Sequence, residues 1–378
     1  MKTNCRIIDT PAELEKAIGQ FEREEAVAVD LEADSMYHYK ERVCLVQIAA
    51  EKLSVMVDPL MIKDLSLLKP LFSNPGIRKV FHGADYDIRS LYRDFNISVS
   101  HLFDTELASR FLGFKESGLQ SVLKMFFNVD IDKKYQKKDW SKRPLSKEMT
   151  AYASTDVIYL LPLAEILIRQ LNEIGRLDWV REECDDLAKV RPDLTETGPL
   201  FSKFKGAGRL KSRSLAVLEA LLQFRRKVAE EKDRPLFKII GNDSIMKIAT
   251  ARPVSLRRLK HTSTLSNRQM SMYGNDVIQA VAGALEIPDD ELPVYLSKKP
   301  PVLPKGAPRR IKALKTWRAS AARTLKIHPG MLCNNALITA LAVNNPVEEN
   351  ALDAIAGMKQ WQKKVFGREI LRVLKKIS

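Results

Sequence analysis

The sequence predicts an α/β domain with a mixed sheet, followed by two all-helical domains. Three observations predict this organisation. Strand and helix patterns alternate through the first half, a stretch rich in Pro and Gly follows, and the helical second half contains an internal repeat. The 378 residues suit two or three domains, and a hydrophobic content of 45% allows each domain to bury a core.

Four strands are predicted by short runs rich in β-branched residues, at 26–30, 43–49, 53–58 and 79–82. A helix is expected over 85–94, and Asp104 is the expected N-cap of a helix that continues through Leu112. Ser146 is expected to cap one long helix, Lys147–Leu171. The polar, basic segment 130–144 predicts a loop over a cleft, although an ordinary solvated connection has the same composition.

The predicted domains are 1–190, 210–295 and 307–378, with a linker at 191–209 and a Pro-rich joint at 300–308. The two helical domains are predicted from residues that recur with a period of 93. Arg225 matches Arg318, and Asn242 matches Asn335. Each copy opens with an amphipathic helix whose apolar stripe predicts a core face: Val217, Leu221, Phe224 and Val228, then Leu314, Trp317, Ala321 and Leu325.

The net charge of +15 is unevenly distributed. Residues 1–200 hold 28 Lys and Arg against 33 Asp and Glu, whereas residues 201–378 hold 34 against 14. A strongly basic half joined to a mildly acidic half indicates a module that binds a polyanion. The alternative is a Lys-rich surface that serves solubility, but the excess is larger than the roughly 2–8 charges that solubility needs in a small domain.

Three features of the sequence predict the cellular compartment of the protein. We expect no membrane-spanning segment, because no apolar run approaches the roughly 20 residues such a helix needs. The first twenty residues do not resemble a signal peptide, and the four cysteines form no Cys-x-x-Cys pair. These features predict a cytoplasmic protein with reduced thiols, and we expect a monomer.

Carboxylates in three segments carry the candidate chemistry. Asp30 and Glu32 end a predicted strand, where positions i and i+2 share a face. In the segment His82–Asp87, either Asp85 or Asp87 could cap a helix or reach a metal at the strand ends. Tyr152 and Asp156 are one helical turn apart. Each piece alone has a plain structural explanation: a solvated strand end, a helix cap or a half-buried aromatic.

Together, the acids predict a two-metal centre for phosphodiester hydrolysis. Oxygen ligands suit Mg²⁺ or Mn²⁺, and two ions roughly 3.5–4 Å apart can activate a water and stabilise the leaving 3′ oxygen. Tyr152 has an unperturbed pKa of about 10, so it is expected to orient the water rather than to deprotonate it. His82 and His101 are expected to make local hydrogen bonds in the fold rather than to bind the metal.

At this point the residues resemble a known family. Asp30-Leu-Glu32, VFHGADYDIRSLYRDF (80–95) and Tyr152-x-x-x-Asp156 are similar to the three motifs of the DEDD exonucleases in their tyrosine form, over roughly residues 5–175. The segment 139–149, DWSKRPLSKEM, is similar to the run that leads into the third motif in ribonuclease D proteins. The resemblance implies an RNase H-like exonuclease domain, with Asp30, Glu32, Asp87 and Asp156 as metal ligands.

The helical repeats resemble HRDC domains, the first more clearly than the second. One nuclease domain with two such domains implies a ribonuclease D-like 3′→5′ exoribonuclease that acts on tRNA precursors and other structured RNA 3′ ends. The first motif departs from the Asp-Thr-Glu-Phe found in many bacterial members, which places the substrate range in question. A DNA 3′→5′ exonuclease and a non-catalytic nucleic-acid-binding scaffold are the alternatives, although the intact acid set argues against the scaffold. Candidate RNA contacts are Lys137, Lys138, Arg143, Arg225 and Arg226, the last two because they are expected to lie off the apolar stripe. Each of them could instead be solvated or form an intramolecular salt bridge.

Overall fold

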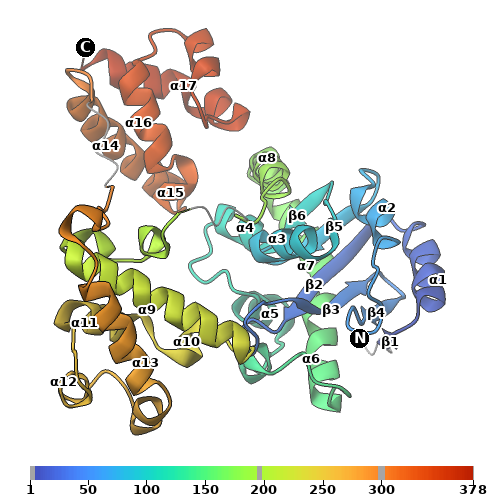
Figure 1. Cartoon of the computed structure of the whole chain (residues 1–378). Helices are drawn as coiled ribbons and strands as arrows, with labels where there is room; N and C mark the ends of the chain where they lie inside the picture. Colours follow the sequence, from blue (N-terminus) through green and yellow to red (C-terminus); the bar gives the residue numbers. More distant parts are fainter. Residues whose placement is uncertain (1–4, 194–197, 297–302, 378) are drawn as a thin grey trace. The chain divides into compact units, whose positions relative to one another are not determined.

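The computed structural model describes residues 5–193, 198–296 and 303–377 (Figure 1). The chain forms two compact units that are not continuous in sequence. One unit comprises 1–33, 43–192 and 301–378, and the other comprises 34–42 and 193–300. The second helical domain therefore belongs with the α/β domain. The loop after the second strand belongs with the first helical domain.

A six-stranded mixed sheet forms the centre of the α/β domain. Its strands are β1 (Arg6–Ile8), β2 (Ala26–Ala33), β3 (Val43–Ala49), β4 (Ser54–Val57), β5 (Arg78–Phe81) and β6 (Leu102–Asp104). The strand order is β1-β4-β3-β2-β5-β6. Strand β3 is antiparallel to β2 and β4, whereas the other three pairings are parallel, so the prediction of a mixed sheet is confirmed. The three-residue edge strands β1 and β6 were not predicted, because runs this short carry no periodic pattern.

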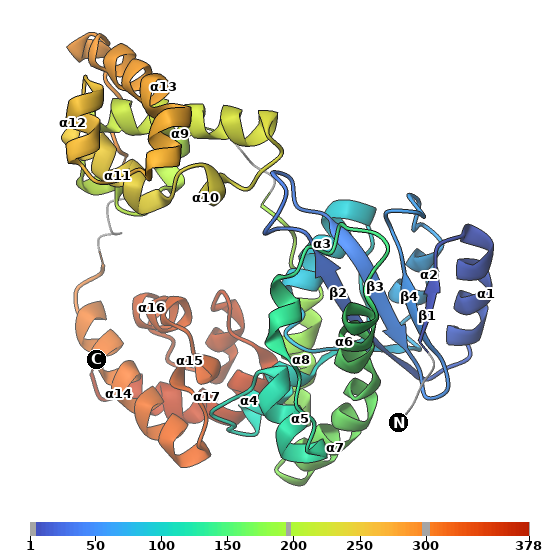
Figure 2. The same ribbon diagram turned by 90° about the horizontal axis from the view of Figure 1, so that it is seen from below.

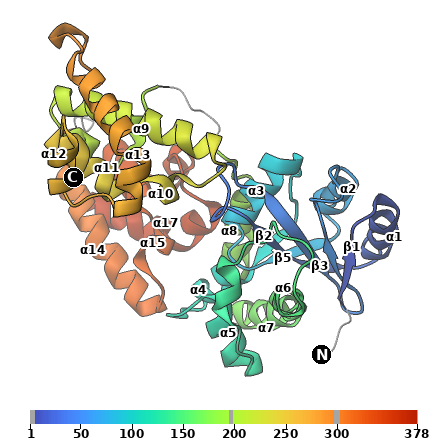
Figure 3. The same cartoon turned by 60° about the horizontal axis from the view of Figure 1, so that its bottom comes forward.

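Eight α-helices and one 3₁₀ turn surround this sheet in the described part of the domain. They are α1 (Pro11–Phe21), α2 (Leu68–Ser73), α3 (Asp85–Phe95), α4 (Thr105–Phe111), α5 (Leu119–Phe127), η1 (Lys133–Lys137), α6 (Lys147–Ile158), α7 (Leu160–Glu173) and α8 (Leu177–Leu187). Asp104 and Ser146 cap α4 and α6 as predicted. Helices α6 and α7 both pack against β2, as Figure 3 shows from one side.

The single long helix predicted from Lys147 is instead two helices that meet at Tyr159. Pro162 explains the break, because a proline ring clashes with the carbonyl four residues earlier, here that of Ile158, and offers no N–H to it. The segment Lys147–Glu173 is long and apolar enough to cross a membrane by those two criteria, which corrects the expectation that no such segment exists. Both helices nevertheless bury residues in the protein core, so length and composition alone carry little weight here.

The second helical domain shares one continuous hydrophobic core with the α/β domain. Its elements are α14 (Ala307–Leu325), α15 (Pro329–Leu332), α16 (Asn335–Asn344), η5 (Glu349–Ala354) and α17 (Gln360–Lys375). Trp361 of α17 stacks on Trp179 of α8, with ring centroids 4.7 Å apart and planes 15° apart. The Glu182 carboxylate accepts the N–H groups of Gln360 and Trp361 at the start of α17. Figure 2 shows α17 beside α8.

The first helical domain has a hydrophobic core of its own. Its elements are η2 (Leu200–Lys203), η3 (Ala207–Arg209), α9 (Ser212–Glu231), α10 (Leu236–Ile239), α11 (Asn242–Ala251), α12 (Leu256–His261), α13 (Asn267–Leu285) and η4 (Asp289–Glu291). The predicted linker 191–209 is partly wrong, because Phe201 and Ala207 are buried in this core. Residues 194–197 of that linker, and 300–302 of the predicted joint, lie outside the described residues.

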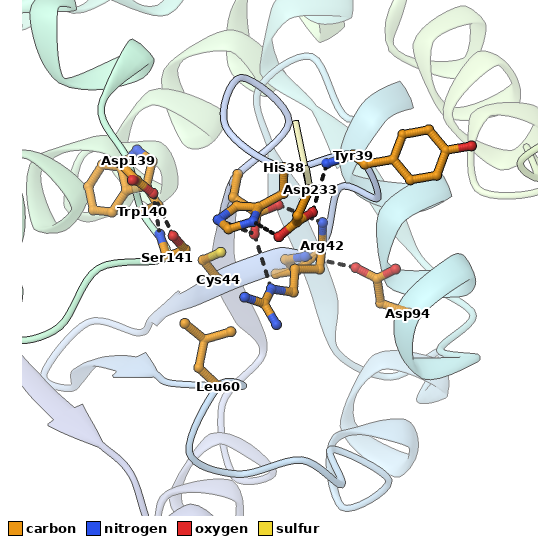
Figure 4. Close-up of polar contacts among 12 residues, drawn as sticks. His38, Tyr39, Arg42, Cys44, Leu60, Asp94, Asp139, Trp140, Ser141 and Asp233 are labelled. Atoms are coloured by element: carbon orange, nitrogen blue, oxygen red, sulfur yellow. Dashed lines mark hydrogen bonds and ion pairs between the residues drawn. The ribbon is translucent and has the colours of Figure 1, made fainter. Parts of the chain in front are cut away.

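The loop Asp34–Arg42 is attached to the first helical domain by polar contacts. His38 Nδ1 lies 2.6 Å from the Asp233 carboxylate, and the Tyr39 N–H donates to the same carboxylate at 3.0 Å. Figure 4 shows both contacts. The Lys238 ammonium lies 4.3 Å from the centroid of the Tyr37 ring. The loop is therefore held by the Asp233 carboxylate, by a cation–π contact and by the hydrogen bond that the Tyr39 hydroxyl accepts from Arg226.

The 93-residue repeat corresponds to the same contacts in both helical domains. Arg225 donates to the side chain of Asn242 at 2.7 Å, and Arg318 donates to that of Asn335 at 3.2 Å. Each arginine also donates to a backbone carbonyl, that of Ile240 and that of Cys333 respectively. The edge-to-face pair Phe224–Tyr273 recurs as Trp317–Phe366. The repeated residues therefore serve the packing of each domain.

Candidate metal centre

Three carboxylates converge at the end of β2. Asp30 and Glu32 lie two residues apart on this strand and so share a face, and Asp156 lies on α6, which packs against it. One oxygen from each of the three lies within 4.8 Å of the others. The structure therefore brings together Asp30, Glu32 and Asp156 as the sequence predicted.

The fourth predicted acid, Asp87, lies in the first turn of α3 and is buried. Its carboxylate is outside the 4.8 Å group, but its charge contributes to raising the pKa of Glu32. Asp85, the alternative ligand in the same motif, is exposed and forms an ion pair with Arg89 at 2.7 Å. Of the two candidates, Asp87 is the one directed into the protein beside the other acids.

Burial and mutual repulsion perturb the whole group of acids. Burial raises the pKa of Asp30 to about 7. Burial and the negative charge of Asp30 raise the pKa values of Glu32, Asp87 and Asp156 well above their ordinary values. One buried oxygen of Asp156, Oδ1, has no hydrogen-bond partner. A group of buried carboxylates with an unsatisfied oxygen suits a divalent cation, because the cation supplies the missing charge and bond.

Tyr152 lies one turn before Asp156 and is hydrogen-bonded to it. Burial, together with the charges of Asp156 and Glu32, raises the pKa of Tyr152 above its ordinary value. The side chain is therefore a neutral phenol. The rings of Tyr135 and Trp140 pack against it, with centroids 5.7 and 6.2 Å away. The predicted loop 130–144 thus lies against the tyrosine, although it contains the 3₁₀ turn η1.

Arg143 anchors this loop to the sheet. Its guanidinium donates to Asp58 through Nε and Nη2, at 2.5 and 2.9 Å, and to the carbonyl of Cys44 at 2.7 Å. These bonds occupy the donors that a phosphate would need, so the structure favours an anchoring role over the predicted RNA contact. Lys137 and Lys138 are exposed. Figure 4 shows Asp139 bonded to Ser141 in the next part of the loop, beside the fully buried Trp140.

The other two predicted RNA contacts occupy different environments. Arg225 is 6% exposed, which corrects the expectation that its side chain faces outward toward RNA. Its guanidinium is directed inward, where it donates hydrogen bonds to the carbonyl of Ile240 and to the side chain of Asn242. Arg226 is half-buried, and its Nε donates to the Tyr39 hydroxyl at 3.2 Å. Neither arginine is therefore a simple surface cation.

The sequence did not reveal that Asp104 connects the start of α4 to the motif that carries Asp87. Besides capping α4, its carboxylate accepts the N–H groups of Gly83 and Ala84 at 2.9 and 2.8 Å. Those residues immediately precede α3, which carries Asp87. The only sequence signal was its position as an N-cap. His82 and His101 make local contacts with Thr105 and Pro75, as the sequence predicted.

Comparison with known proteins gives a consistent assignment. Residues 5–172 match the family described as 3′-5′ exonuclease, and residues 214–281 and 307–374 each match the HRDC domain. The second HRDC-like prediction is thereby confirmed. A ribonuclease D from Gluconacetobacter diazotrophicus is 30% identical over 371 residues, which cover 97% of this chain and 91% of that protein.

Two further proteins extend the comparison. An exosome complex exonuclease from Saccharomyces cerevisiae is 40% identical over 194 residues, covering 51% of this chain and 26% of that protein. The crystal structure of Escherichia coli RNase D superposes with a TM-score of 0.71 at 24% identity, covering 100% of this chain and 99% of that one, and so shares the fold. The chain belongs to the ribonuclease D family and is a 3′→5′ exoribonuclease with one exonuclease domain and two HRDC domains.

Proposed function

We propose that the chain removes nucleotides one at a time from RNA 3′ ends and releases 5′-nucleoside monophosphates. Asp30, Glu32, Asp87 and Asp156 are the proposed ligands of two divalent ions, Mg²⁺ or Mn²⁺. The observation that carries this proposal is the group of three carboxylate oxygens within 4.8 Å, with Asp87 buried beside it. Bound ions of this kind acidify a water and stabilise a leaving oxygen.

The protein's own residues prepare the site for an anionic substrate. Among the described residues, no lysine, arginine or histidine forms an ion pair with Asp30, Glu32 or Asp156. These carboxylates therefore remain available for metal ions that the substrate phosphate can approach. Tyr152 is the proposed positioning group. As a neutral phenol on the same face as Asp156, it can hold a water by hydrogen bonding. Tyr135 and Trp140 fix the orientation of its ring.

The proposed substrates are tRNA precursors and other structured RNAs. The E. coli relative is described as an exoribonuclease involved in structured RNA processing, which supports this proposal by analogy. The basic second half of the chain supports it by charge, since phosphate contacts dominate affinity for nucleic acids. Lys137 and Lys138, exposed on the loop that packs against Tyr152, are proposed contacts near the 3′ end. We further propose that the protein acts in the cytoplasm as a monomer.

The test is digestion of a 5′-labelled RNA with a 3′ tail, in Mg²⁺, in Mn²⁺ and with chelator, beside DNA of the same sequence. A metal-dependent ladder that shortens from the 3′ end of RNA supports the proposal. Preferential shortening of DNA would show that DNA is the substrate and would leave the proposed metal centre unchanged. Tight RNA binding without any cleavage would favour the non-catalytic scaffold.

A further inference from the structure

A cavity of about 410 Å³ lies at the seam between the exonuclease domain and the second HRDC domain, within one compact unit. Arg110, Lys115 and Lys326 contribute cations to its lining, and Phe114, Ile327 and Met331 contribute apolar surface. Its lining contains no carboxylate. A concentration of positive charge beside apolar surface suits a nucleotide, which presents a phosphate and a base.

The three cations are exposed, and none of them forms an ion pair with any carboxylate in the described ranges of the chain. Most surface cations that lie near acids are partly neutralised by them, as Lys124 is by Asp130 at 2.6 Å. The adjacent cavity is mixed in charge, because Asp85, Glu106 and Glu183 line it together with Lys359 and with Arg110, which both cavities share. Of these two cavities, only the seam cavity has a lining with cations and no carboxylate.

The two walls of this cavity are fixed to each other. The Arg176 guanidinium donates to the carbonyl of Phe111 at 2.8 Å and to that of Leu325 at 3.1 Å, and so joins the ends of α4 and α14. Gly113 has a φ of +92°, and a Cβ there would lie 2.5 Å from the Lys326 carbonyl oxygen. The close approach of these two backbones requires glycine. The cations are thus presented on a rigid surface.

We propose that this cavity binds the phosphodiester backbone of the RNA substrate upstream of its 3′ end. The identification of the ligand as RNA rests on the proposed function. The proposal assigns a binding role to the second HRDC domain, through Lys326, and makes the seam a second point of attachment. Because α4 is tied to the start of α3 through Asp104, the cavity and Asp87 belong to one continuous framework.

The test compares two full-length variants that lose the same charge. In the seam variant, the substitutions are Arg110→Gln, Lys115→Gln and Lys326→Gln. In the matched control they are Lys16→Gln, Arg23→Gln and Lys52→Gln, which are exposed residues on α1, in the turn that follows α1 and in the turn between β3 and β4. Fluorescence anisotropy with a labelled single-stranded RNA of about 20 nucleotides, in chelator and over a salt series, gives the dissociation constant and its salt slope.

We expect the seam variant to bind on the order of tenfold more weakly and to lose about two units of salt slope, because single strands contribute roughly 0.7 per phosphate contact. Equal losses in the seam and control variants would overturn the proposal. Lys326→Glu alone is expected to weaken binding as well. If binding is unaffected by this single variant, the second HRDC domain is not part of the site.

Turnover in Mg²⁺ separates this inference from the proposed function. A length series of RNAs should show normal turnover of trinucleotides by the seam variant and a raised KM only for longer RNAs. Loss of turnover at every length would place the effect in the catalytic site or the fold and overturn the inference. Failure of the wild-type protein to cleave any RNA, with seam-dependent binding retained, would overturn the proposed function and leave the inference standing.

Discussion

Asp104 accepts the backbone N–H of Ala84 at 2.8 Å, and this bond joins the start of α4 to the start of α3. The same carboxylate accepts the N–H groups of Gly83, Glu106 and Leu107. It is 2% exposed, so these bonds form in an environment from which water is excluded. The position of Asp87 therefore depends on a residue outside the metal-binding motifs.

We predict that Asp104→Asn lowers both stability and kcat. An amide has one acceptor oxygen and places its NH₂ group against backbone donors, so part of the network is lost at about 1–3 kcal/mol. Thermal unfolding and single-turnover kinetics measure the two effects. The control is Asp132→Asn, which makes the same change at an exposed cap of η1, where the asparagine oxygen can still accept the Lys134 N–H. A kcat unchanged from wild type, despite a lower Tm, would show that Asp104 is structural only.

Asp30→Asn is predicted to abolish hydrolysis and to preserve RNA binding, because it removes a metal ligand without disturbing the basic surfaces. It should also stabilise the metal-free protein, since the other three acids lose a repelling neighbour. Anisotropy, turnover and thermal unfolding in chelator test the three effects. Turnover at the wild-type rate would contradict the assignment of this ligand.

The stabilisation by Mg²⁺ should increase with pH. In the metal-free protein the pKa of Asp30 is about 7, against about 3.9 in an unfolded chain. Between these two pKa values the folded state holds a proton that the unfolded state has lost. The stabilisation that this proton provides is complete below pH 3.9 and is lost as the pH rises through 7. A metal ion replaces that proton. We expect a larger Mg²⁺-induced rise in Tm at pH 8 than at pH 6, with a flatter profile for Asp30→Asn.

Ending the chain at residue 300 should destabilise the exonuclease domain. This truncation removes Trp361 and exposes Trp179 and Phe111, which pack against it. We expect a lower Tm and increased binding of a hydrophobic dye. Trp361→Ala is the milder variant, with a predicted loss of about 3–5 kcal/mol. A truncated chain with the wild-type Tm would show that the shared core contributes nothing to the exonuclease domain.

Arg225→Gln and Arg318→Gln should each lower the Tm, because both arginines satisfy an asparagine side chain and a backbone carbonyl inside their domains. Arg225 is the more buried of the two, so its substitution is expected to cost more. Arg257→Gln, at an exposed position on α12, serves as the control. If Arg225→Gln changed the RNA affinity and left the Tm unchanged, the result would contradict the packing role of Arg225 and support the predicted RNA contact.

The acids of the site could be predicted from sequence because they occur in short motifs with fixed spacing. Asp30 and Glu32 share a face by strand periodicity, and Tyr152 lies near Asp156 by helix periodicity. The network of Asp104 joins residues twenty apart, and no local pattern encodes it. Arg225 was misplaced for a related reason. A long arginine can lie off an apolar stripe in a helical projection and still direct its guanidinium inward.

The domain organisation shows the same limit. The 93-residue repeat indicates two copies of one domain, but it does not indicate which copy shares a core with the exonuclease domain. That depends on side chains outside the repeat, such as Glu182 and Trp179 of α8. The seam was equally hidden, because Gly113 and Lys326 are distant in sequence.

The stack of Trp179 on Trp361 also bears on how the two copies can diverge. A change in the ring of one tryptophan alters the surface on which the other rests, so substitutions there are tolerated mainly in pairs. The first copy packs around a core of its own. Exchanging the first copy for a homologous domain should be the simpler graft, whereas a donor for the second copy must bring a compatible α8 with it.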